Sequence, residues 1–291
     1  MFKQWCAVLV AAVVLPAVAV AADKNPYITQ EYKYGGPYVP TPQVVVDEML
    51  KLGNVGPKDY VMDLGSGDGI IVLTAGRKFG ARGLGVDIDA DLVKQSNAAA
   101  EKSGVADRVR FVQQDIFKVN LADATVVTLY LLPGMMLNLR PKLLAELKPG
   151  TRIVAHDYHF AEWDADSMIE LDVPEKEKVN GVPKAYLRLW TVPAKVQGAW
   201  QVKTAAAGGE AVTLALKQQF QSLDGSATVG GRPVKLTQAK VQGEDVSFAL
   251  PVDAKGTVGR FSGRVRGNGI EGTVDVPGRA PVAFTAVRPA G

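Results

Sequence analysis

The sequence predicts an α/β domain with a doubly wound, mostly parallel sheet, followed by a smaller all-β domain that forms an antiparallel barrel or sandwich. From about residue 43 to about residue 193, apolar strand patterns alternate with helical patterns, as expected for parallel strands with right-handed crossovers. Beyond that point the helical period is absent, and short β-rich runs are separated by turns containing Gly or Asp. We therefore expect three parts, which are a signal peptide over 1–22, an α/β domain over 23–193 and an antiparallel β domain over 194–291.

Composition and charge limit the classes of function. The 291 residues suffice for one large or two ordinary domains, and 47% hydrophobic with 22% charged residues is typical of a globular protein. The net charge of +3 is too small to indicate nucleic acid, so no nucleic-acid partner is expected. Residues 194–291 carry 12 basic and 7 acidic side chains, a net charge of +5, whereas 23–193 carry −3. We interpret the basic β domain as a solvated surface, with contact to envelope polymers or an anionic membrane surface as the alternative.

The first 22 residues have the pattern of a secretory signal. Lys3 provides a positive start, an apolar run covers 6–20, and small residues precede Asp23. The run is short for a membrane-spanning helix, and Pro16 within it favours a cleaved signal over an uncleaved anchor. Cleavage would remove Cys6, the only cysteine, and with it any disulfide, thiol nucleophile or cysteine metal ligand. The expected location is periplasmic or extracellular, or membrane-anchored if the segment is retained.

A lead-in and a first helix precede the alternating elements. Residues 27–42 are rich in aromatic residues and proline, and we expect them to run in an extended conformation over the site. Thr41 is predicted to cap a helix whose first residue is Pro42. Apolar residues then recur at helical spacing up to Gly53, the expected end of the helix.

The alternating region predicts a sheet with a final strand pair. Strands are expected near 60–64, 83–87, 108–113, 124–131 and 151–156, and helices near 69–79, 90–103 and 135–147. Residues 167–173 and 184–192 are expected to form the last two strands, joined by a charged loop over 175–183. In the β domain, strands are expected over 199–205, 211–219, 233–240, 245–250, 258–266, 269–275 and 281–287.

A glycine-rich turn follows the first strand, in the stretch Asp63-Leu64-Gly65-Ser66-Gly67-Asp68-Gly69. Glycines at alternate positions let the backbone approach a ligand, and the free N–H groups of the next helix can bind a carboxylate or phosphate. The dinucleotide fingerprint G-x-G-x-x-G requires its third glycine one residue later, where Ile70 stands. A glycine-rich turn of some other α/β protein is the alternative interpretation.

Two further strands end in carboxylates on the same expected edge of the sheet. Asp87 follows the glycine turn by about 20 residues, a position suited to both hydroxyls of a ribose. The third strand ends at Asp115, which Ile116 follows. The three features in this order, on alternating strands and helices, indicate a nucleoside-containing ligand.

An acid two residues before G-x-G-x-G resembles motif I of the class I (seven-β-strand) S-adenosylmethionine-dependent methyltransferases, which have a Rossmann-like fold. Three other segments narrow this resemblance: Val39-Pro40-Thr41-Pro42, Leu132-Pro133-Gly134-Met135-Met136 and Gly150-Thr151-Arg152-Ile153-Val154-Ala155. Together they are similar to the ATP synthase c-subunit lysine methyltransferase family and its prokaryotic relatives, over about residues 36–165. Members of that family have no β domain like 194–291, and they work where S-adenosylmethionine is made or imported.

The resemblance implies S-adenosyl-L-methionine as cofactor and assigns roles to motif residues. It implies that Asp63 lies near the positively charged end of the methionyl group, that Asp115 accepts from the adenine amine and that Ile116 packs on the ring. The implied cofactor-binding residues are Asp63, Gly65, Ser66, Gly67, Asp87, Asp115 and Ile116.

The end of the fourth strand is expected to face the methyl group. The sequence there, Tyr130-Leu131-Leu132-Pro133, lacks the Asn/Asp-Pro-Pro-aromatic sequence of amide and base N-methyltransferases, which favours an amine acceptor. Tyr130 either orients the amine through its hydroxyl or is a core aromatic residue. A lysine amine has a pKa of about 10.4 and must lose its proton, and Asp157 is our candidate proton acceptor. His156 and His159 are too few ligands for a metal site, so no metal is expected.

The predicted function is therefore S-adenosylmethionine-dependent methyl transfer, with a protein lysine as the expected acceptor. A small-molecule or lipid acceptor is the second hypothesis. A non-catalytic envelope binding protein on a methyltransferase fold is the third. The signal segment favours this last hypothesis, whereas the complete set of glycines and carboxylates argues against it.

Export can be tested on the mature chain. If residues 1–22 are a cleaved signal, N-terminal sequencing of the protein from its native host should begin between Ala21 and Lys24. Intact Met1 in the soluble cytoplasmic fraction would contradict export.

Overall fold

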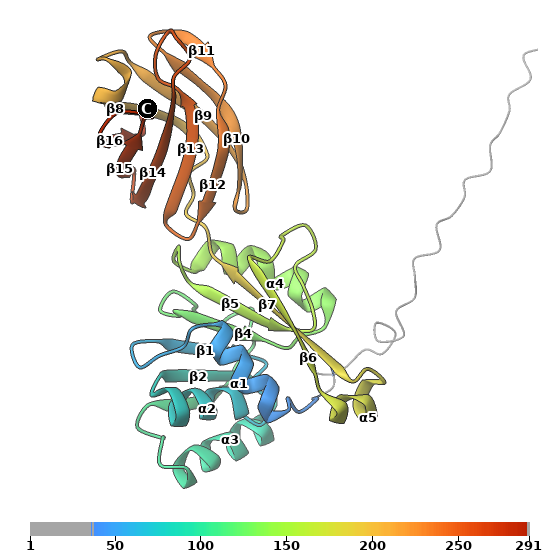
Figure 1. Cartoon of the computed structure of the whole chain (residues 1–291). Helices are drawn as coiled ribbons and strands as arrows, with labels where there is room; N and C mark the ends of the chain where they lie inside the picture. Colours follow the sequence, from blue (N-terminus) through green and yellow to red (C-terminus); the bar gives the residue numbers. More distant parts are fainter. Residues whose placement is uncertain (1–35, 37, 290–291) are drawn as a thin grey trace, which may run out of the picture.

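The computed structural model describes residues 36 and 38–289, so the signal segment and the lead-in over 27–35 lie outside the described residues. The described chain forms an α/β domain and a β-barrel, which are joined by one short segment (Figure 1). None of the helices in this described part is long and apolar enough to cross a bilayer.

The α/β domain contains a seven-stranded sheet in the order β3-β2-β1-β4-β5-β7-β6. Its first five strands are parallel, β7 is antiparallel to β5, and β6 is antiparallel to β7, which confirms the predicted sheet and its final strand pair. The bounds are β1 Tyr60–Leu64, β2 Arg82–Asp87, β3 Val109–Gln113, β4 Val126–Leu129, β5 Arg152–His156, β6 Ser167–Asp172 and β7 Lys184–Thr191.

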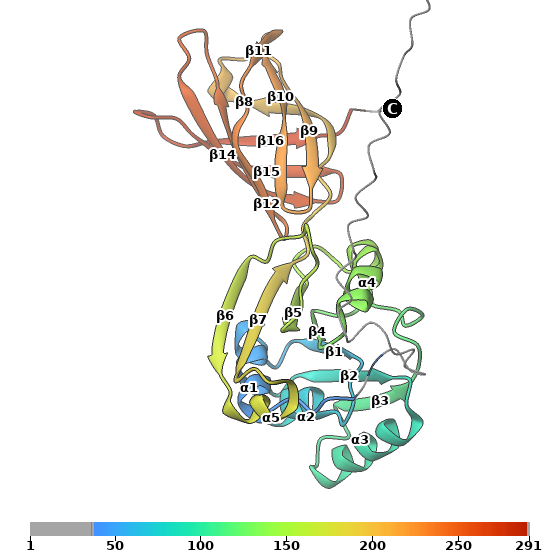
Figure 2. The ribbon, with the colours of Figure 1, turned by 90° about the vertical axis from the view of Figure 1, so that its right-hand side faces the viewer.

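Helices cover both faces of this sheet (Figure 1, Figure 2). Three of them, α1 Gln43–Leu52, α2 Ile70–Phe79 and α3 Ala90–Lys102, pack on one face, while α4 Pro133–Glu146 packs on the other. Beside α4, the segment 114–124 contributes buried Ile116, Val119 and Leu121 to the same core. Between β6 and β7, where we expected a loop, the chain forms the 3-10 helix η1 Pro174–Lys176 and the short helix α5 Glu177–Asn180.

The β domain is a closed antiparallel barrel of eight strands, with a ninth strand, β11, paired to β10 alone. Closure comes from the pairing of β9 with β10, while β10 meets β12 only at Ser222 and Lys240. The bounds are β8 Gly198–Thr204, β9 Val212–Gln219, β10 Ser222–Val229, β11 Arg232–Val234, β12 Thr237–Gln242, β13 Asp245–Pro251, β14 Val258–Arg266, β15 Gly269–Asp275 and β16 Val282–Val287, with the 3-10 helix η2 Ala205–Ala207 after β8.

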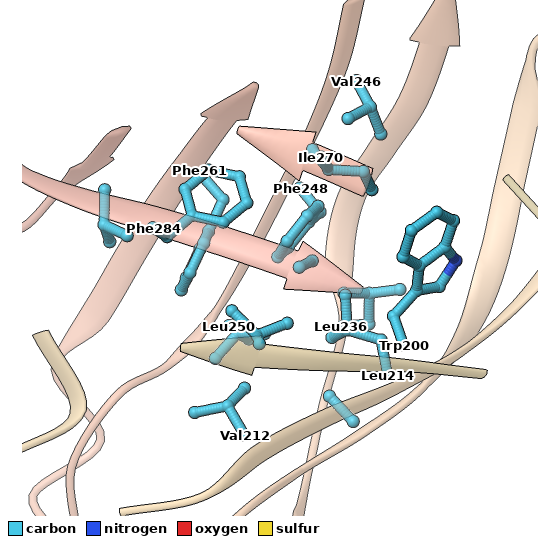
Figure 3. Packing of buried hydrophobic residues seen from close by; sticks show 14 of the residues in the cluster. Trp200, Val212, Leu214, Leu236, Val246, Phe248, Leu250, Phe261, Ile270 and Phe284 are labelled. Atoms are coloured by element: carbon cyan, nitrogen blue, oxygen red, sulfur yellow. The ribbon is translucent and has the colours of Figure 1, made fainter. Parts of the chain in front are cut away.

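The barrel interior is a packed apolar core (Figure 3). The Phe248 ring lies flat against that of Phe261 at 4.7 Å between centroids, and Phe284 meets Phe261 edge-on at 5.2 Å. Trp200 is also fully buried, and its indole Nε1 donates a hydrogen bond to the Val196 carbonyl over 2.7 Å. Along β9, for example, buried Val212, Leu214 and Leu216 alternate with exposed residues, as a closed sheet around a core requires.

The positive charges on the outside of the barrel are partly offset by neighbouring acids. Arg264 pairs with Glu244 at 2.6 Å, and Arg232 pairs with Glu210 at 2.7 Å. Arg260 stands opposite Asp275 in the β14–β15 register. This mixing of signs agrees with our interpretation of a solvated barrel surface.

Two sequence-based expectations about element ends are wrong. Helix α1 begins at Gln43 with Pro42 as its N-cap, and no side chain makes a capping hydrogen bond, so Thr41 is not a cap. In the barrel, the expected strand over 233–240 is two strands, β11 and β12, because the chain leaves β10 and then turns to pair with β13.

Strand β10 was missed altogether. Its sequence contains Asp224 and Gly225, which are typical of turns. The real turn lies before it, at Phe220 and Gln221, where Phe220 has a φ of 53° without the Gly or Asn that normally marks such a turn. Pairing with β9 along its whole length makes β10 a strand despite its composition.

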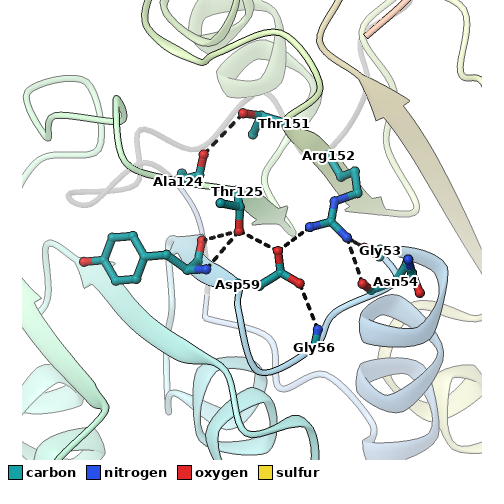
Figure 4. A network of polar contacts seen from close by, with 9 residues as sticks. Gly53, Asn54, Gly56, Asp59, Ala124, Thr125, Thr151 and Arg152 are labelled. Carbon is teal, nitrogen blue, oxygen red and sulfur yellow. Dashed lines mark hydrogen bonds and ion pairs between the residues drawn. The ribbon is translucent and has the colours of Figure 1, made fainter. Parts of the chain in front are cut away.

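A polar network fastens α1 to the amino ends of the sheet strands (Figure 4). The Asp59 carboxylate accepts from Thr125 Oγ1 over 2.7 Å and from the Gly56 N–H over 2.8 Å, and it also pairs with Arg152. Through its Nη1, Arg152 donates to the carbonyl groups of Gly53 at 2.7 Å and Asn54 at 2.8 Å. Arg152 therefore binds two carbonyl groups just after α1 and the partly buried Asp59 carboxylate at once.

Loss of this arginine should destabilise the α/β domain. Arg152→Ala leaves Asp59 and two carbonyl groups without their donor, and we expect a loss of about 2–3 kcal/mol in the free energy of unfolding. Urea denaturation followed by tryptophan fluorescence measures it. The control is Arg108→Ala, which removes an exposed pair with Asp107 and should leave the midpoint nearly unchanged. Equal midpoints for both variants would contradict a structural role for the network.

Candidate active site

A cavity of about 980 Å³ opens at the carboxyl ends of the parallel strands. The β1 register places Leu64 beside Val86 of β2 and Leu129 of β4, so the residues that follow these strands leave the sheet at one level. All lining residues lie between Gly36 and Tyr186, and none comes from the barrel. The cavity lies where the strand order reverses, between β1 and β4. Ligand sites in sheets of this kind are typically found at such a reversal.

The first four residues of the glycine loop 65–69 line this cavity, and the conformation of the loop requires its glycines. Gly65, Gly67 and Gly69 have φ values of 82°, 53° and 78°, in the left-handed region that residues with a Cβ avoid. A Cβ on Gly67 would also lie 2.7 Å from the ring of Tyr38, which packs on the loop from the lead-in. Gly36, Tyr38, Val39 and Thr41 of the described lead-in line the cavity, so this part lies at the site as expected.

The Asp87 carboxylate is held in place by two backbone N–H groups. Its Oδ2 accepts from Gly67 over 2.8 Å and its Oδ1 from Asp89 over 2.9 Å. These bonds connect the end of β2 to the glycine loop and leave lone pairs on both oxygens directed to other donors. A carboxylate oriented in this way is able to accept from a pair of vicinal hydroxyl groups.

Asp63 is a buried carboxyl group on β1 at the cavity wall. Its side chain is 3% exposed, and Thr128 Oγ1 donates to its Oδ1 over 2.7 Å. Burial raises the pKa of Asp63 to about 7, and the Asp87 and Asp68 carboxylates add to this effect, whereas the Thr128 hydrogen bond opposes it. A buried acid of this kind is stabilised in its ionised form by a cation that binds beside it.

Asp115 and Ile116 complete the predicted nucleoside end. Both line the cavity, and Asp115 Oδ1 accepts from the Phe117 N–H over 2.9 Å. Ile116 is 6% exposed and belongs to the core beneath α4. The structure thus brings all seven predicted cofactor-binding residues to one cavity: Asp63, Gly65, Ser66, Gly67, Asp87, Asp115 and Ile116.

The other end of the cavity is aromatic, and it contains both predicted catalytic residues. Tyr130, which follows β4, stacks on His156 with 4.0 Å between ring centroids, and the Tyr158 ring lies 6.3 Å away. Tyr186 of β7 lines the same end. Burial raises the pKa of Tyr130, with a further contribution from Asp157, so its phenol remains protonated at neutral pH. Tyr130 therefore presents a neutral hydroxyl, although its ring also packs as a core residue would.

Asp157, immediately after β5, is engaged by groups that the sequence did not reveal. Its Oδ2 accepts from Lys176 Nζ over 2.5 Å, its Oδ1 accepts from the Tyr186 N–H over 3.1 Å, and its φ is 63°. Lys176 is only 4% exposed, and its Nζ lies 3.2 Å from His156 Nε2. In sequence, Lys176 stands in a run of alternating charges that is typical of a solvated loop, so no pattern identified it.

His156 is a neutral partner in this cluster. Burial lowers its pKa to about 4, Lys176 adds to this effect, and Asp157 opposes it. His159 is exposed and uses its Nδ1 to accept from the Ala161 N–H. Within the described residues, no group of three or more His, Cys, Asp or Glu side chains is arranged to hold a metal ion.

The cavity fits a cationic nucleoside ligand. Its charged lining consists of six carboxyl groups and one amine, from Asp63, Asp68, Asp87, Asp89, Asp115, Asp157 and Lys184. S-Adenosylmethionine combines a ribose, an adenine, an ammonium and a sulfonium, which match the oriented Asp87, the Asp115–Ile116 wall and the buried Asp63.

Comparisons with known proteins agree with this assignment. A model of the ANTKMT methyltransferase domain matches residues 63–167. A protein-lysine N-methyltransferase of Saccharolobus islandicus is 42% identical over 137 residues, which cover 47% of this chain and 85% of that protein. A lysine N-methyltransferase of Xenopus laevis, named for the ATP synthase c-subunit, is 32% identical, over 56% of this chain and 72% of its own length.

A solved structure supports the cofactor. The crystal structure of an RNA methyltransferase from Salinibacter ruber in complex with S-adenosyl-L-homocysteine has a TM-score of 0.50 and 45% identity, and it covers 54% of this chain and 96% of its own. The resemblance that the motifs indicated is thereby confirmed. This chain belongs to the S-adenosylmethionine-dependent methyltransferase family that contains these lysine N-methyltransferases.

Proposed function

We propose that this enzyme transfers the methyl group of S-adenosylmethionine to a lysine side chain of a protein. The observation that carries the proposal is the aromatic end of the cavity, where Tyr130, Tyr158 and Tyr186 line the same cavity as Asp157. A lysine side chain has an aliphatic stem and an amine head, and it suits a site with aromatic walls and a polar group. The names of the S. islandicus and X. laevis relatives support the same acceptor.

At the cofactor end, each carboxyl group has a separate role in the proposal. Asp87, fixed by two N–H groups, accepts from the ribose hydroxyls, and Asp115 accepts from the adenine amine while Ile116 packs on the ring. Asp63 lies at the methionyl end, where a positive group offsets the cost of its burial. The N–H groups of Gly65 and Ser66 donate to the Val86 carbonyl and that of Gly67 to Asp87, so the loop is held against the end of β2, and its glycines keep the backbone compact where the ligand approaches.

At the acceptor end, the residues position an amine and favour its neutral form. The bound cofactor supplies an electrophilic methyl group, so the protein has mainly to align the nitrogen and keep its lone pair free. Lys176 already neutralises Asp157, so the site presents no unpaired negative charge that would hold the acceptor as an ammonium ion. Asp157 retains lone pairs that can accept the departing proton, and the Tyr130 hydroxyl can orient the amine.

The acidic cavity lining favours a protein acceptor over RNA. Carboxyl groups outnumber amines six to one in the cavity lining, which is unfavourable for a phosphate backbone. The S. ruber relative is named an RNA methyltransferase, so RNA belongs in the test as the competing acceptor. Absence of a nucleic-acid partner stays a prediction for this chain.

We also propose that the chain acts outside the cytoplasm, on the basis of its first 22 residues. In that location, cofactor supply would limit turnover, and proteins of the cell envelope would be the accessible acceptors.

The pKa of Asp63 makes cofactor binding depend on pH. Only the ionised carboxylate pairs with the methionyl ammonium, so affinity should fall as pH drops below the pKa of about 7. We expect the Kd for S-adenosylhomocysteine, measured by calorimetry, to rise about tenfold from pH 8 to pH 6, as linkage to one proton requires. Asp63→Asn should bind more weakly and show a nearly flat profile. A wild-type profile as flat as that of the variant would contradict the role of Asp63.

The acceptor class can be read from the methylated product. With tritiated S-adenosylmethionine, poly-L-lysine and a host envelope protein extract should gain label that acid hydrolysis releases as methyllysine, whereas total RNA should not. Label in RNA alone would overturn the lysine assignment.

The role of the Tyr130 hydroxyl is tested in the same assay. If the hydroxyl orients the amine, Tyr130→Phe should lower kcat by about tenfold or more while the Kd for S-adenosylhomocysteine stays unchanged. An unchanged kcat would show that Tyr130 is a packing residue only.

A further inference from the structure

The barrel touches the α/β domain through the turn between β9 and β10. The ring of Phe220, at the tip of this turn, stacks on Trp163 with 5.5 Å between centroids and a 12° angle between planes. The guanidinium of Arg140 on α4 lies 5.4 Å from the centroid of the same ring. Next to Phe220, the Gln221 amide donates to the Asp164 carbonyl over 2.7 Å. The tip is thus inserted into the α/β domain, and Phe220 packs with its core.

Phe220 keeps an uncommon conformation to make this contact. Its φ of 53° is disfavoured for a residue with a large side chain, and such conformations persist where the surroundings hold them. The Gln218 amide supports the turn, because its Nε2 donates to the Phe220 carbonyl over 2.8 Å and to the Ala194 carbonyl over 2.9 Å. The barrel therefore presents Phe220 in one fixed direction.

The contacted segment, 157–166, is the connection from β5 to β6, and its first residues belong to the active site. Asp157 and Tyr158 line the cavity, and Phe160 and Trp163 are buried a few residues later. The segment has little regular structure of its own, with one isolated bridge between Phe160 and Trp163 and a positive φ at Ala161. Its conformation therefore depends on what its side chains pack against.

A set of contacts connects the barrel to Phe160, three residues after Asp157. Trp163 stacks on Phe160 at 5.4 Å, and the Trp190 indole of β7 donates to the Trp163 carbonyl over 2.8 Å. Arg140 donates to the Phe160 carbonyl over 2.7 Å while it faces the Phe220 ring. The cofactor end lacks such a connection among the described residues, because its residues come from the glycine loop and the ends of β2 and β3.

We propose that the barrel is a positioning domain for the acceptor site. Phe220 is its positioning residue: by packing on Trp163 and beneath Arg140, it fixes the segment that carries Asp157 and Tyr158. The catalytic consequence rests on the proposed lysine acceptor, whereas the structural role of Phe220 is independent of the acceptor.

The test compares full-length Phe220→Ala, Phe220→Tyr and Gln221→Ala with the wild type. Phe220→Ala should lower kcat/KM for poly-L-lysine by about tenfold or more, a loss typical of a displaced catalytic group, and keep the Kd for S-adenosylhomocysteine within about twofold. Phe220→Tyr keeps the ring stack and should restore the rate. Gln221→Ala removes one hydrogen bond without opening the core, so it should show a smaller effect in the same direction and remains informative if Phe220→Ala unfolds.

Hydrogen exchange measures the order of segment 157–166 directly, so it tests the positioning role without depending on the identity of the acceptor. Amides in 157–166 should exchange faster in Phe220→Ala, whereas those in the glycine loop 65–69 should not, whatever the acceptor proves to be. The control is Val258→Ala, an exposed apolar position of the barrel that should alter neither rate nor exchange. Equal losses in cofactor affinity and in kcat/KM, or no change in 157–166 exchange, would overturn the positioning role.

Discussion

The parallel register of β1 with β2 and β4 is the constraint on which the active site depends. It sets Leu64, Val86 and Leu129 side by side, so the glycine loop, Asp87 and Tyr130 leave the sheet at a common edge. Backbone bonds then fix their relative positions, since the Gly67 N–H is bound to Asp87 across the two strands. A shift of one residue in either pairing would reverse the faces of the strand and separate these groups.

The two ends of the cavity are held by different means. The cofactor end is built from backbone: glycine φ values, strand ends and N–H groups that bind carboxylates. The acceptor end is built from side chains, in which Lys176 and His156 surround Asp157 and aromatic rings stack around Tyr130. Backbone-built sites tolerate substitution of their neighbours, whereas side-chain clusters depend on the packing behind them. This difference explains why the barrel affects the acceptor end of the cavity and not the cofactor end.

The sequence predicted the features that depend on local patterns. Strand and helix alternation, the mostly parallel sheet, and the glycine loop followed by Asp87 and Asp115 all depend on short stretches of chain. Long-range features were missed. The charges around Lys176 are typical of a solvated loop, but in the folded protein Lys176 pairs with Asp157. Likewise, β10 has the composition of a loop, but it pairs with β9 along its whole length. Phe220 carries no turn signal, and the contacts that support its φ of 53° come from Gln218 in the barrel and from Trp163 in the other domain.

The short connection between the domains has a mechanical consequence. Residues between β7 and β8 are bound on both sides: the Val192 carbonyl accepts from the Gly150 N–H, the Ala194 N–H donates to Gly243, and the Gln218 side chain bonds to Val196. A chain fastened in this way acts as a rigid coupling, and the Phe220 contact adds a second point of attachment that resists rotation. The barrel is therefore held against the α/β domain at two points. A partner bound to the outer surface of the barrel would therefore lie at a defined distance and orientation relative to the catalytic pocket.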